Sequence, residues 1–141
     1  MILLDTDHFS VLTDARHRFH ERFASRLTNE IQRIALPVIA VEEQLRAWLA
    51  QIHRSRSAQA LITPYGRLVH LLDVLADWEI VTWTEQSAAE FDSLRKERIR
   101  IGTQDLRIAA IALSEGALLL SSNLRDFQQV PNLQAEDWLY S

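Results

Sequence analysis

Four carboxylates stand at the ends of apolar segments, where side chains of this type could hold a metal ion. They are Asp5, Glu43, Asp105 and Asp126. Carboxylates that are brought together repel one another and raise one another's pKa, unless a cation compensates their charge. Hard divalent cations with oxygen ligands are the usual compensation, and they are also used to cleave phosphodiesters. The four acids therefore predict a metal-dependent nuclease.

The segments that carry these acids alternate between short apolar runs and longer helical patterns. Predicted strands cover residues 2–5, 33–36, 79–83 and 117–120, and predicted helices cover residues 10–28, 37–53, 57–76, 85–98 and 103–114. This alternation favours an α/β fold with a mostly parallel central sheet and helices on both faces. Ligand sites in such sheets lie beyond the carboxyl ends of the strands. Because Asp5 ends one predicted strand and Asp126 follows another, folding would gather acids that are far apart in the sequence.

Individual residues mark the boundaries of the predicted helices. Pro37 suits the first turn of a helix, and Gly116 suits the position just after a helix end. Thr103 is a predicted N-cap, which would place Asp105 in the first helical turn. The triplet Pro-Tyr-Gly at residues 64–66 is predicted to interrupt the helix over residues 57–76.

The composition limits the class of protein. A chain of 141 residues with 48% hydrophobic residues suits one domain over residues 1–141. The absence of cysteine excludes disulfides, thiolate metal sites and cysteine nucleophiles, and it fits a cytoplasmic protein. We expect neither a signal peptide nor a membrane span, because no basic leader or long apolar stretch occurs. The net charge of −4 argues against a protein that coats nucleic acid non-specifically.

Each acid also has an ordinary structural explanation. Asp5 could cap the next helix, and Asp105 could interact with the dipole of its own helix. Glu42 precedes Arg46 by four residues and suits a surface ion pair, whereas Glu43 shares a helical row with small apolar residues. We therefore expect Glu43, rather than Glu42, to face the site.

The last acid has the weakest individual signal. Asp126 is predicted to lie in a loop, where an acid is usually only solvated, and Asn123 is an alternative oxygen donor. Asp7 adds a fifth carboxylate near Asp5, either as a support for the site or as a turn residue. The placement of all the acids together is more informative than any one of them.

Four segments carry a resemblance to a known family. They are residues 3–7 (Leu-Leu-Asp-Thr-Asp), 38–45 (Val-Ile-Ala-Val-Glu-Glu-Gln-Leu), 102–110 (Gly-Thr-Gln-Asp-Leu-Arg-Ile-Ala-Ala) and 121–127 (Ser-Ser-Asn-Leu-Arg-Asp-Phe). In order and spacing they resemble the motifs of PIN-domain ribonucleases, specifically toxins of the VapC type. Ala40 stands where a hydroxyl residue is usual, and Asp7 stands where Asn is more familiar. Neither departure removes one of the four acids.

The resemblance implies a three-layer α/β/α domain that binds Mg²⁺ or Mn²⁺ and hydrolyses RNA. Asp5, Glu43 and Asp105 would hold the metal, and Asp126 would complete the catalytic acids. Thr6, Ser121, Asn123 and Arg125 would contact the substrate. The arginines at 18, 22 and 26 and the basic residues at 95, 96, 98 and 100 are two further candidates for an RNA-binding rim. The resemblance also implies a small antitoxin protein as partner and a homodimer.

Two alternatives remain open. The sequence Asp5-Thr6-Asp7 after an apolar run resembles the nucleophile motif of phosphatases of the haloacid-dehalogenase type, in which Asp5 would attack phosphorus. That mechanism needs a lysine, and Lys96 is the only one in the chain. The other alternative is a non-catalytic PIN-like module that binds a protein partner. A zinc site is not expected, because the five histidines lack ligand spacing.

Overall fold

Five short strands form the centre of the computed structural model, which describes residues 1–140. The strands are β1 (Ile2–Leu4), β2 (Ile34–Pro37), β3 (Ile80–Val81), β4 (Leu118–Leu120) and β5 (Gln134–Glu136). They are ordered β3-β2-β1-β4-β5, and each neighbouring pair is parallel. The predicted α/β fold with a mostly parallel sheet is therefore confirmed, and β1, which leads to Asp5, lies at its middle.

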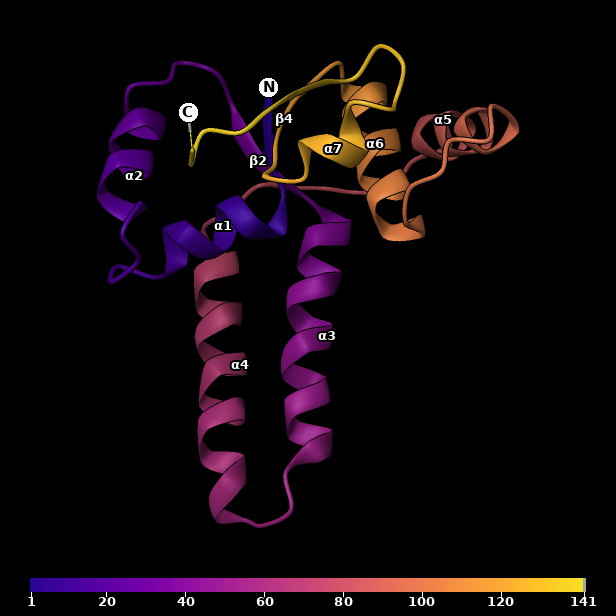
Figure 1. The fold of residues 1–141 in the computed structure, drawn as a ribbon. Coiled ribbons are helices and arrows are strands. Elements are labelled where there is room, and N and C mark those ends of the chain that lie inside the picture. The colour runs from indigo at the N-terminus through magenta and orange to yellow at the C-terminus, as the bar shows by residue number, and fades with distance from the viewer. Residues whose placement is uncertain (141) are drawn as a thin grey trace.

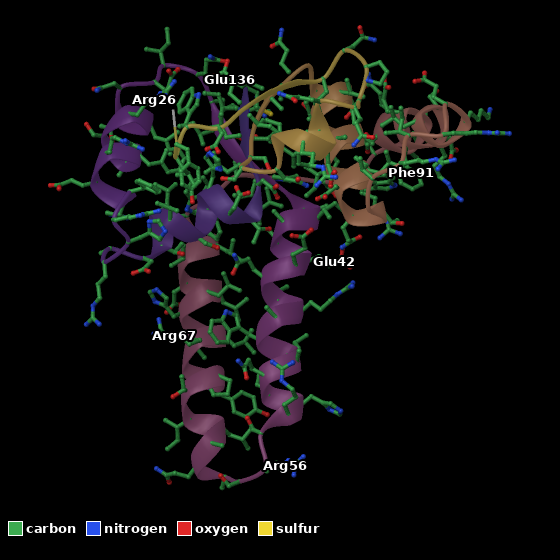
Figure 2. All side chains as sticks on the ribbon, in the orientation of Figure 1. Arg26, Glu42, Arg56, Arg67, Phe91 and Glu136 are labelled. Carbon is green, nitrogen blue, oxygen red and sulfur yellow. The ribbon has the colours of Figure 1, made fainter. Side chains whose placement is uncertain are left out.

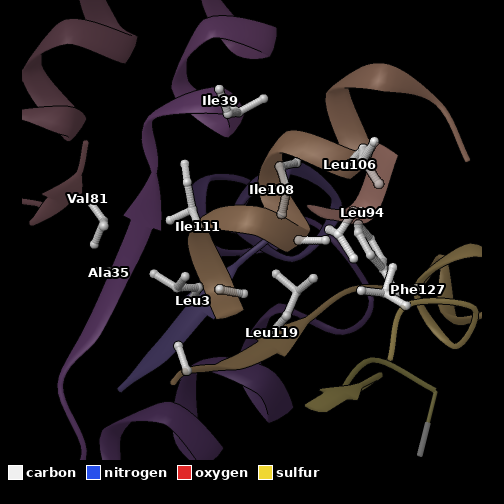
Figure 3. Packing of buried hydrophobic residues seen from close by; sticks show 14 residues of the cluster. Leu3, Ala35, Ile39, Val81, Leu94, Leu106, Ile108, Ile111, Leu119 and Phe127 are labelled. Atoms are coloured by element: carbon white, nitrogen blue, oxygen red, sulfur yellow. The ribbon is translucent and has the colours of Figure 1, made fainter. Parts of the chain in front are cut away.

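Helices cover both faces of this sheet. They are α1 (Thr6–Thr13), α2 (His20–Thr28), α3 (Val38–Arg54), α4 (Ile62–Leu75), α5 (Glu85–Lys96), α6 (Thr103–Glu115) and α7 (Leu124–Phe127), with a 3₁₀ turn at Gln59–Leu61. Successive strand residues point to opposite faces. Leu3 accordingly packs with Ile108 and Ile111 of α6, as Figure 3 shows, whereas Ile2 and Leu4 pack in a second cluster with residues of α1, α2 and α4.

Two long helices extend away from the sheet. Figure 1 shows α3 and α4 side by side as a hairpin, with α1 lying across the ends that are nearer the sheet. The start of α3 follows β2 without a loop, because Pro37 ends the strand and also occupies the N-cap position. This junction fixes the direction in which the first turns of α3 leave the sheet.

The predicted helix over residues 10–28 is wrong. The chain forms α1 and α2 with a non-helical connection at residues 14–19. In this connection the Asp14 carboxylate accepts a hydrogen bond from the Arg16 backbone, and His17 Nδ1 accepts one from the Phe19 backbone. Such local side-chain bonds offer the backbone an alternative to helix, so the helical spacing of the arginines was misleading.

The predicted break at residues 64–66 is also wrong, because α4 runs through it. Pro64 is the third residue of α4, where a backbone N–H has no partner within the helix anyway. Thr103 is the first residue of α6 rather than its N-cap, a position taken by Gly102. The end of α6 at Gly116 is as predicted, with a left-handed φ of 59° that glycine tolerates.

Sequence reasoning did not find α7 or β5. No helix within residues 1–140 has the length and apolar character needed to cross a membrane.

Candidate functional site: a carboxylate cluster at the end of the sheet

Asp5 lies where the carboxyl end of β1 meets β4. Its Oδ1 accepts a hydrogen bond of 2.8 Å from the Thr6 backbone and so caps α1. Its Oδ2 accepts a hydrogen bond of 2.7 Å from the Ser121 hydroxyl, which follows β4. The side chain is buried, with only 7% of the residue exposed. The capping role considered for Asp5 is therefore real, but it uses only one of the two carboxylate oxygens.

This burial makes the charge on Asp5 unfavourable. The pKa of Asp5 is raised to about 6, first because the carboxylate is buried and then because the negative charge of Asp7 is close. The hydrogen bond from Ser121 acts in the opposite direction and lowers the pKa, but it does not offset the burial. A buried acid with a raised pKa is typical of a functional site, where a ligand or cation can stabilise the charge.

Glu43 reaches the same place from α3. The Thr6 hydroxyl donates a hydrogen bond of 2.8 Å to Glu43 Oε2, and this bond joins the first turn of α1 to α3. The pKa of Glu43 is raised, chiefly by burial and also by the negative charge of Asp105. Glu42 points elsewhere, to Arg46 at 2.5 Å and to the Gln104 amide at 2.9 Å. The expected ion pair between Glu42 and Arg46 is therefore confirmed.

Asn123 connects the two remaining acids. Its Nδ2 donates hydrogen bonds to Asp105 Oδ2 at 3.1 Å and to Asp126 Oδ2 at 3.0 Å. Asp105 lies in the first turn of α6, and Asp126 lies in α7. Burial raises the pKa of Asp105, and the charges of Asp126 and Asp7 raise it further. One amide thus bonds to two carboxylates. Within residues 1–140 the side-chain hydrogen bonds of Asn123 are made by its Nδ2, which leaves its oxygen for a further ligand.

Asp7 joins the cluster through the segment after β4 and also contacts a buried histidine. Its Oδ2 accepts a hydrogen bond of 2.9 Å from the Ser122 backbone, and its Oδ1 lies 2.6 Å from His8 Nδ1. His8 Nε2 accepts a hydrogen bond of 3.1 Å from the Trp138 backbone. A neutral imidazole with its proton on Nδ1 satisfies both partners. The sequence assigns no role to His8, which the structure shows to be fully buried.

The oxygen-rich cluster fits a hard cation held partly through water. Within residues 1–140, no three His, Asp or Glu side chains are arranged so that they could hold a metal ion by themselves. Magnesium, however, usually keeps several waters and needs only one or two protein carboxylates. The available donors are carboxylate, hydroxyl and amide oxygens, and three of the acids have raised pKa values. Both properties suit Mg²⁺ or Mn²⁺.

The other residues with predicted roles either bond to the acids or lie away from them. Thr6, Ser121 and Asn123 all bond to the acids, so the first effect of these side chains is to position carboxylates. Arg125 is exposed on α7. The arginines at 18, 22 and 26, which were candidates for an RNA-binding rim, pack on aromatic rings. The guanidinium of Arg26, for example, lies 3.8 Å from the Trp138 ring centre.

Comparison with known proteins agrees with this geometry. A family model described as PIN domain matches residues 2–133. Ribonuclease VapC2 of Haemophilus influenzae is 35% identical over 80 residues, which are 54% of this chain and 61% of that protein. The tRNA(fMet)-specific endonuclease VapC of Salmonella typhimurium is 29% identical over 85 residues, which are 57% of this chain and 64% of that protein. The matches thus span less than two thirds of these relatives.

Solved structures share the whole fold. The structure of VapBC2 from Rickettsia felis, bound to a DNA fragment from its promoter, has a TM-score of 0.76 and 24% identity, and the match covers 98% of this chain and 99% of that one. VapBC-1 from nontypeable Haemophilus influenzae has a TM-score of 0.74 and 24% identity, and the match covers 98% of both chains. Because the family model spans nearly the entire chain and the fold agrees, this chain belongs to the PIN-domain family.

Proposed function

We propose that this protein is an endoribonuclease of the VapC type that uses Mg²⁺ or Mn²⁺ to hydrolyse RNA. The observation that carries the proposal is the gathering of Asp5, Glu43, Asp105 and Asp126 at one end of the sheet by hydrogen bonds from Thr6, Ser121 and Asn123. The relatives named as VapC ribonucleases support the choice of RNA as substrate.

Asp5, Glu43 and Asp105 are the residues that would hold the cation. When bound, a divalent cation supplies compensation for the charge that develops on the phosphate and on the leaving oxygen. The raised pKa values of these three acids support this assignment, since each carboxylate is more costly to ionise in the cation's absence. Ser121 and Thr6 keep Asp5 and Glu43 in place with hydrogen bonds of 2.7 and 2.8 Å.

A carboxylate of the cluster would also accept a proton. Hydrolysis requires that a water oxygen bonds to phosphorus, that its proton is removed and that the bond to the leaving oxygen breaks. Glu43 or Asp126 would take this proton.

We further propose a small antitoxin and a second copy of the chain as partners. The antitoxin is supported by the VapBC complexes that share the fold. The homodimer is supported by an apolar depression of about 360 Å³ on α3, where Val38, Val41, Leu45 and Leu49 are lining residues. Leu49 is 55% exposed, and burial of such a side chain against another subunit would remove apolar surface from water.

The phosphatase alternative receives little support. Within residues 1–140, the hydrogen bonds of the Asp5 carboxylate come from Thr6 and Ser121, and Lys96 is exposed at the end of α5. A lysine that steadies a phosphorylated aspartate would have to contact the group on Asp5. The non-catalytic alternative is the one that the experiment must separate from the nuclease.

The test compares RNA cleavage by the wild type, Asp5→Asn and Asp92→Asn. Asp92 is exposed on α5 and provides the same change of charge away from the cluster. We expect Asp5→Asn to lose cleavage by a factor of about a thousand or more while it stays folded, because asparagine can still cap α1. Asp92→Asn should cut RNA as the wild type does, and EDTA should stop both.

Two outcomes would contradict the proposal. Unchanged cleavage by Asp5→Asn would remove this residue from the site. Absence of cleavage by the wild type on every RNA, with a partner protein still bound, would favour the non-catalytic module.

A further inference from the structure

A cavity of about 710 Å³ lies between α1, α3 and α4. Its lining includes Ser10 and Thr13 of α1, Gln44 and Trp48 of α3, and Arg67 and His70 of α4. This volume is in the range of small-molecule and cofactor sites. None of the roles proposed above uses this cavity.

The cavity is built by three helix faces that converge. Gln44 and Trp48 are four residues apart on α3, and Arg67 and His70 are three residues apart on α4, so each pair shares a face. Leu71, which is buried, supplies an apolar wall, and Trp48 is half-buried beside the polar lining. Seven of the eleven lining residues are polar or charged, so the cavity suits a polar ligand with one flat apolar part.

The contact between α1 and α3 connects the carboxylate cluster to the cavity. Thr6 of α1 donates to Glu43 of α3 at 2.8 Å, and Gln44 of α3 donates to Ser10 of α1 at 3.0 Å. The first bond belongs to the cluster, and the second lies at the cavity wall. Thr6 and Ser10 are four residues apart, which is about one helical turn or 6 Å. A chain molecule that crosses the cluster can therefore place its next unit in the cavity.

The charges of the cavity favour an anion. Arg16 and Arg67 are exposed, and none of the ion pairs within residues 1–140 involves either guanidinium. The acidic residue in the lining is Asp14, whose carboxylate accepts a hydrogen bond from the Arg16 backbone. Figure 2 shows Arg67 beside the middle of α4. In contrast, the guanidiniums of Arg22 and Arg26 are engaged with Phe19 and Trp138.

We propose that this cavity binds one nucleotide of the RNA strand next to the phosphate that is cut. This inference rests on the proposed nuclease function and extends it to a second subsite. The nucleobase stacks on the indole of Trp48, and Arg16 and Arg67 contact the phosphate with their planar guanidiniums. Gln44 and His70 provide hydrogen-bonding groups for the base or ribose. An aromatic surface between cations, one turn from a phosphodiesterase site, suits a nucleotide better than an acidic peptide.

The test measures binding separately from cleavage. A 5′-labelled single-stranded RNA of mixed sequence is titrated with Asp5→Asn protein in EDTA, and affinity is read by fluorescence anisotropy. Two double variants are added to this background: Arg16→Glu with Arg67→Glu, and Arg54→Glu with Arg56→Glu as control. Both pairs change the charge equally, and Arg54 and Arg56 are exposed at the far end of the hairpin.

The cavity variant should bind RNA roughly tenfold or more weakly than the control, and its salt dependence should be less steep by about 0.7 for each lost phosphate contact. Trp48→Leu should weaken binding further, whereas Trp83→Leu, at an exposed tryptophan, should not. In protein that retains Asp5, the cavity variant should show a raised KM with an unchanged kcat, because the subsite binds RNA without touching the reacting phosphate.

Equal RNA affinity of the cavity variant and the control would contradict the proposed subsite. If both proteins still cleave RNA when Asp5 is retained, the proposed nuclease function is unaffected by that result. A cavity variant that keeps its RNA affinity but loses an acidic peptide partner would also overturn the subsite. The proposed nuclease function itself would be contradicted by a different result, namely that the wild type cuts no RNA in the presence of Mn²⁺.

Discussion

The Ser121 hydroxyl donates a hydrogen bond of 2.7 Å to the carboxylate of Asp5, although the two residues are 116 positions apart in the sequence. The same Ser121 oxygen accepts a hydrogen bond of 3.0 Å from the Asn123 backbone. This serine therefore joins the end of β1 to the loop that carries Asn123, which in turn holds Asp105 and Asp126. The position of one hydroxyl affects most of the cluster.

Ser121→Ala should shift the pH dependence of RNA cleavage to higher pH. The hydrogen bond from Ser121 lowers the pKa of Asp5, so its loss raises that pKa further above 6 and delays ionisation. We expect the acidic limb of the pH–rate profile to move by roughly half a unit to one unit, since one hydrogen bond contributes about 1 kcal/mol. Ser122→Ala is the matched control, because Ser122 is exposed and binds Asp7 only through its backbone. Equal profiles for both variants would exclude a positioning role for Ser121.

Asp5 should make the fold less stable as the pH rises. Its pKa is 3.8 when unperturbed and about 6 in the folded state, so the folded state holds the proton more tightly. The free energy of unfolding should therefore fall as the pH increases from about 4 to about 6 and then level off, by about 3 kcal/mol. Urea unfolding in EDTA at several pH values, compared with Asp5→Asn, isolates this contribution. Asp5→Asn should be the more stable protein at pH 7.5 and should lose that advantage near pH 4.

A divalent cation should restore the stability that is lost when Asp5 ionises. At a Mn²⁺ concentration 100 times its dissociation constant, the fold should gain about 2.7 kcal/mol, which corresponds to a rise of several degrees in Tm. Thermal unfolding with and without Mn²⁺ measures the gain without any need for RNA. Asp92→Asn should gain as much as the wild type, whereas Asp5→Asn should gain clearly less. A similar gain in all three proteins would place the cation away from Asp5.

His8→Leu should destabilise the protein by about 2–4 kcal/mol, because it leaves Asp7 and the Trp138 backbone N–H without their buried partner. The exposed residue His53 provides the comparison, and His53→Leu should change stability by less than about 0.5 kcal/mol. Denaturation with urea at pH 7.5 measures both. If the two variants unfold at the same urea concentration, the hydrogen bonds from Asp7 through His8 to Trp138 do not contribute to the free energy of unfolding.

Features that depend on neighbouring residues could be predicted from the sequence. Asp105 in the first turn of α6 and Gly116 at its end follow from helix-terminal preferences. The parallel sheet follows from short apolar runs that alternate with helices. The paired acids Glu42 and Glu43 could be distinguished because only Glu42 has Arg46 one turn later.

Features that depend on strand pairing could not be predicted. The bond from Ser121 to Asp5 exists because β1 pairs with β4, and the bond from the Trp138 backbone to His8 exists because the chain continues from β5 past α1. Neither contact has a local sequence signal. The strand β5 was missed because Gln134–Glu136 lacks the apolar run that marks the other strands, as is common at the edge of a sheet.

The hairpin of α3 and α4 gives the protein a natural place for added sequence. Its turn at residues 55–58 is exposed except for the half-buried Ser55, and Figure 1 shows it at the end remote from the sheet. Doubling the length of a flexible loop costs only about 0.6 kcal/mol in closure entropy. A fluorophore, an epitope or a tether for single-molecule work can therefore be inserted there, while the junction at Pro37, which has no loop to absorb a change, would transmit any insertion directly to Glu43.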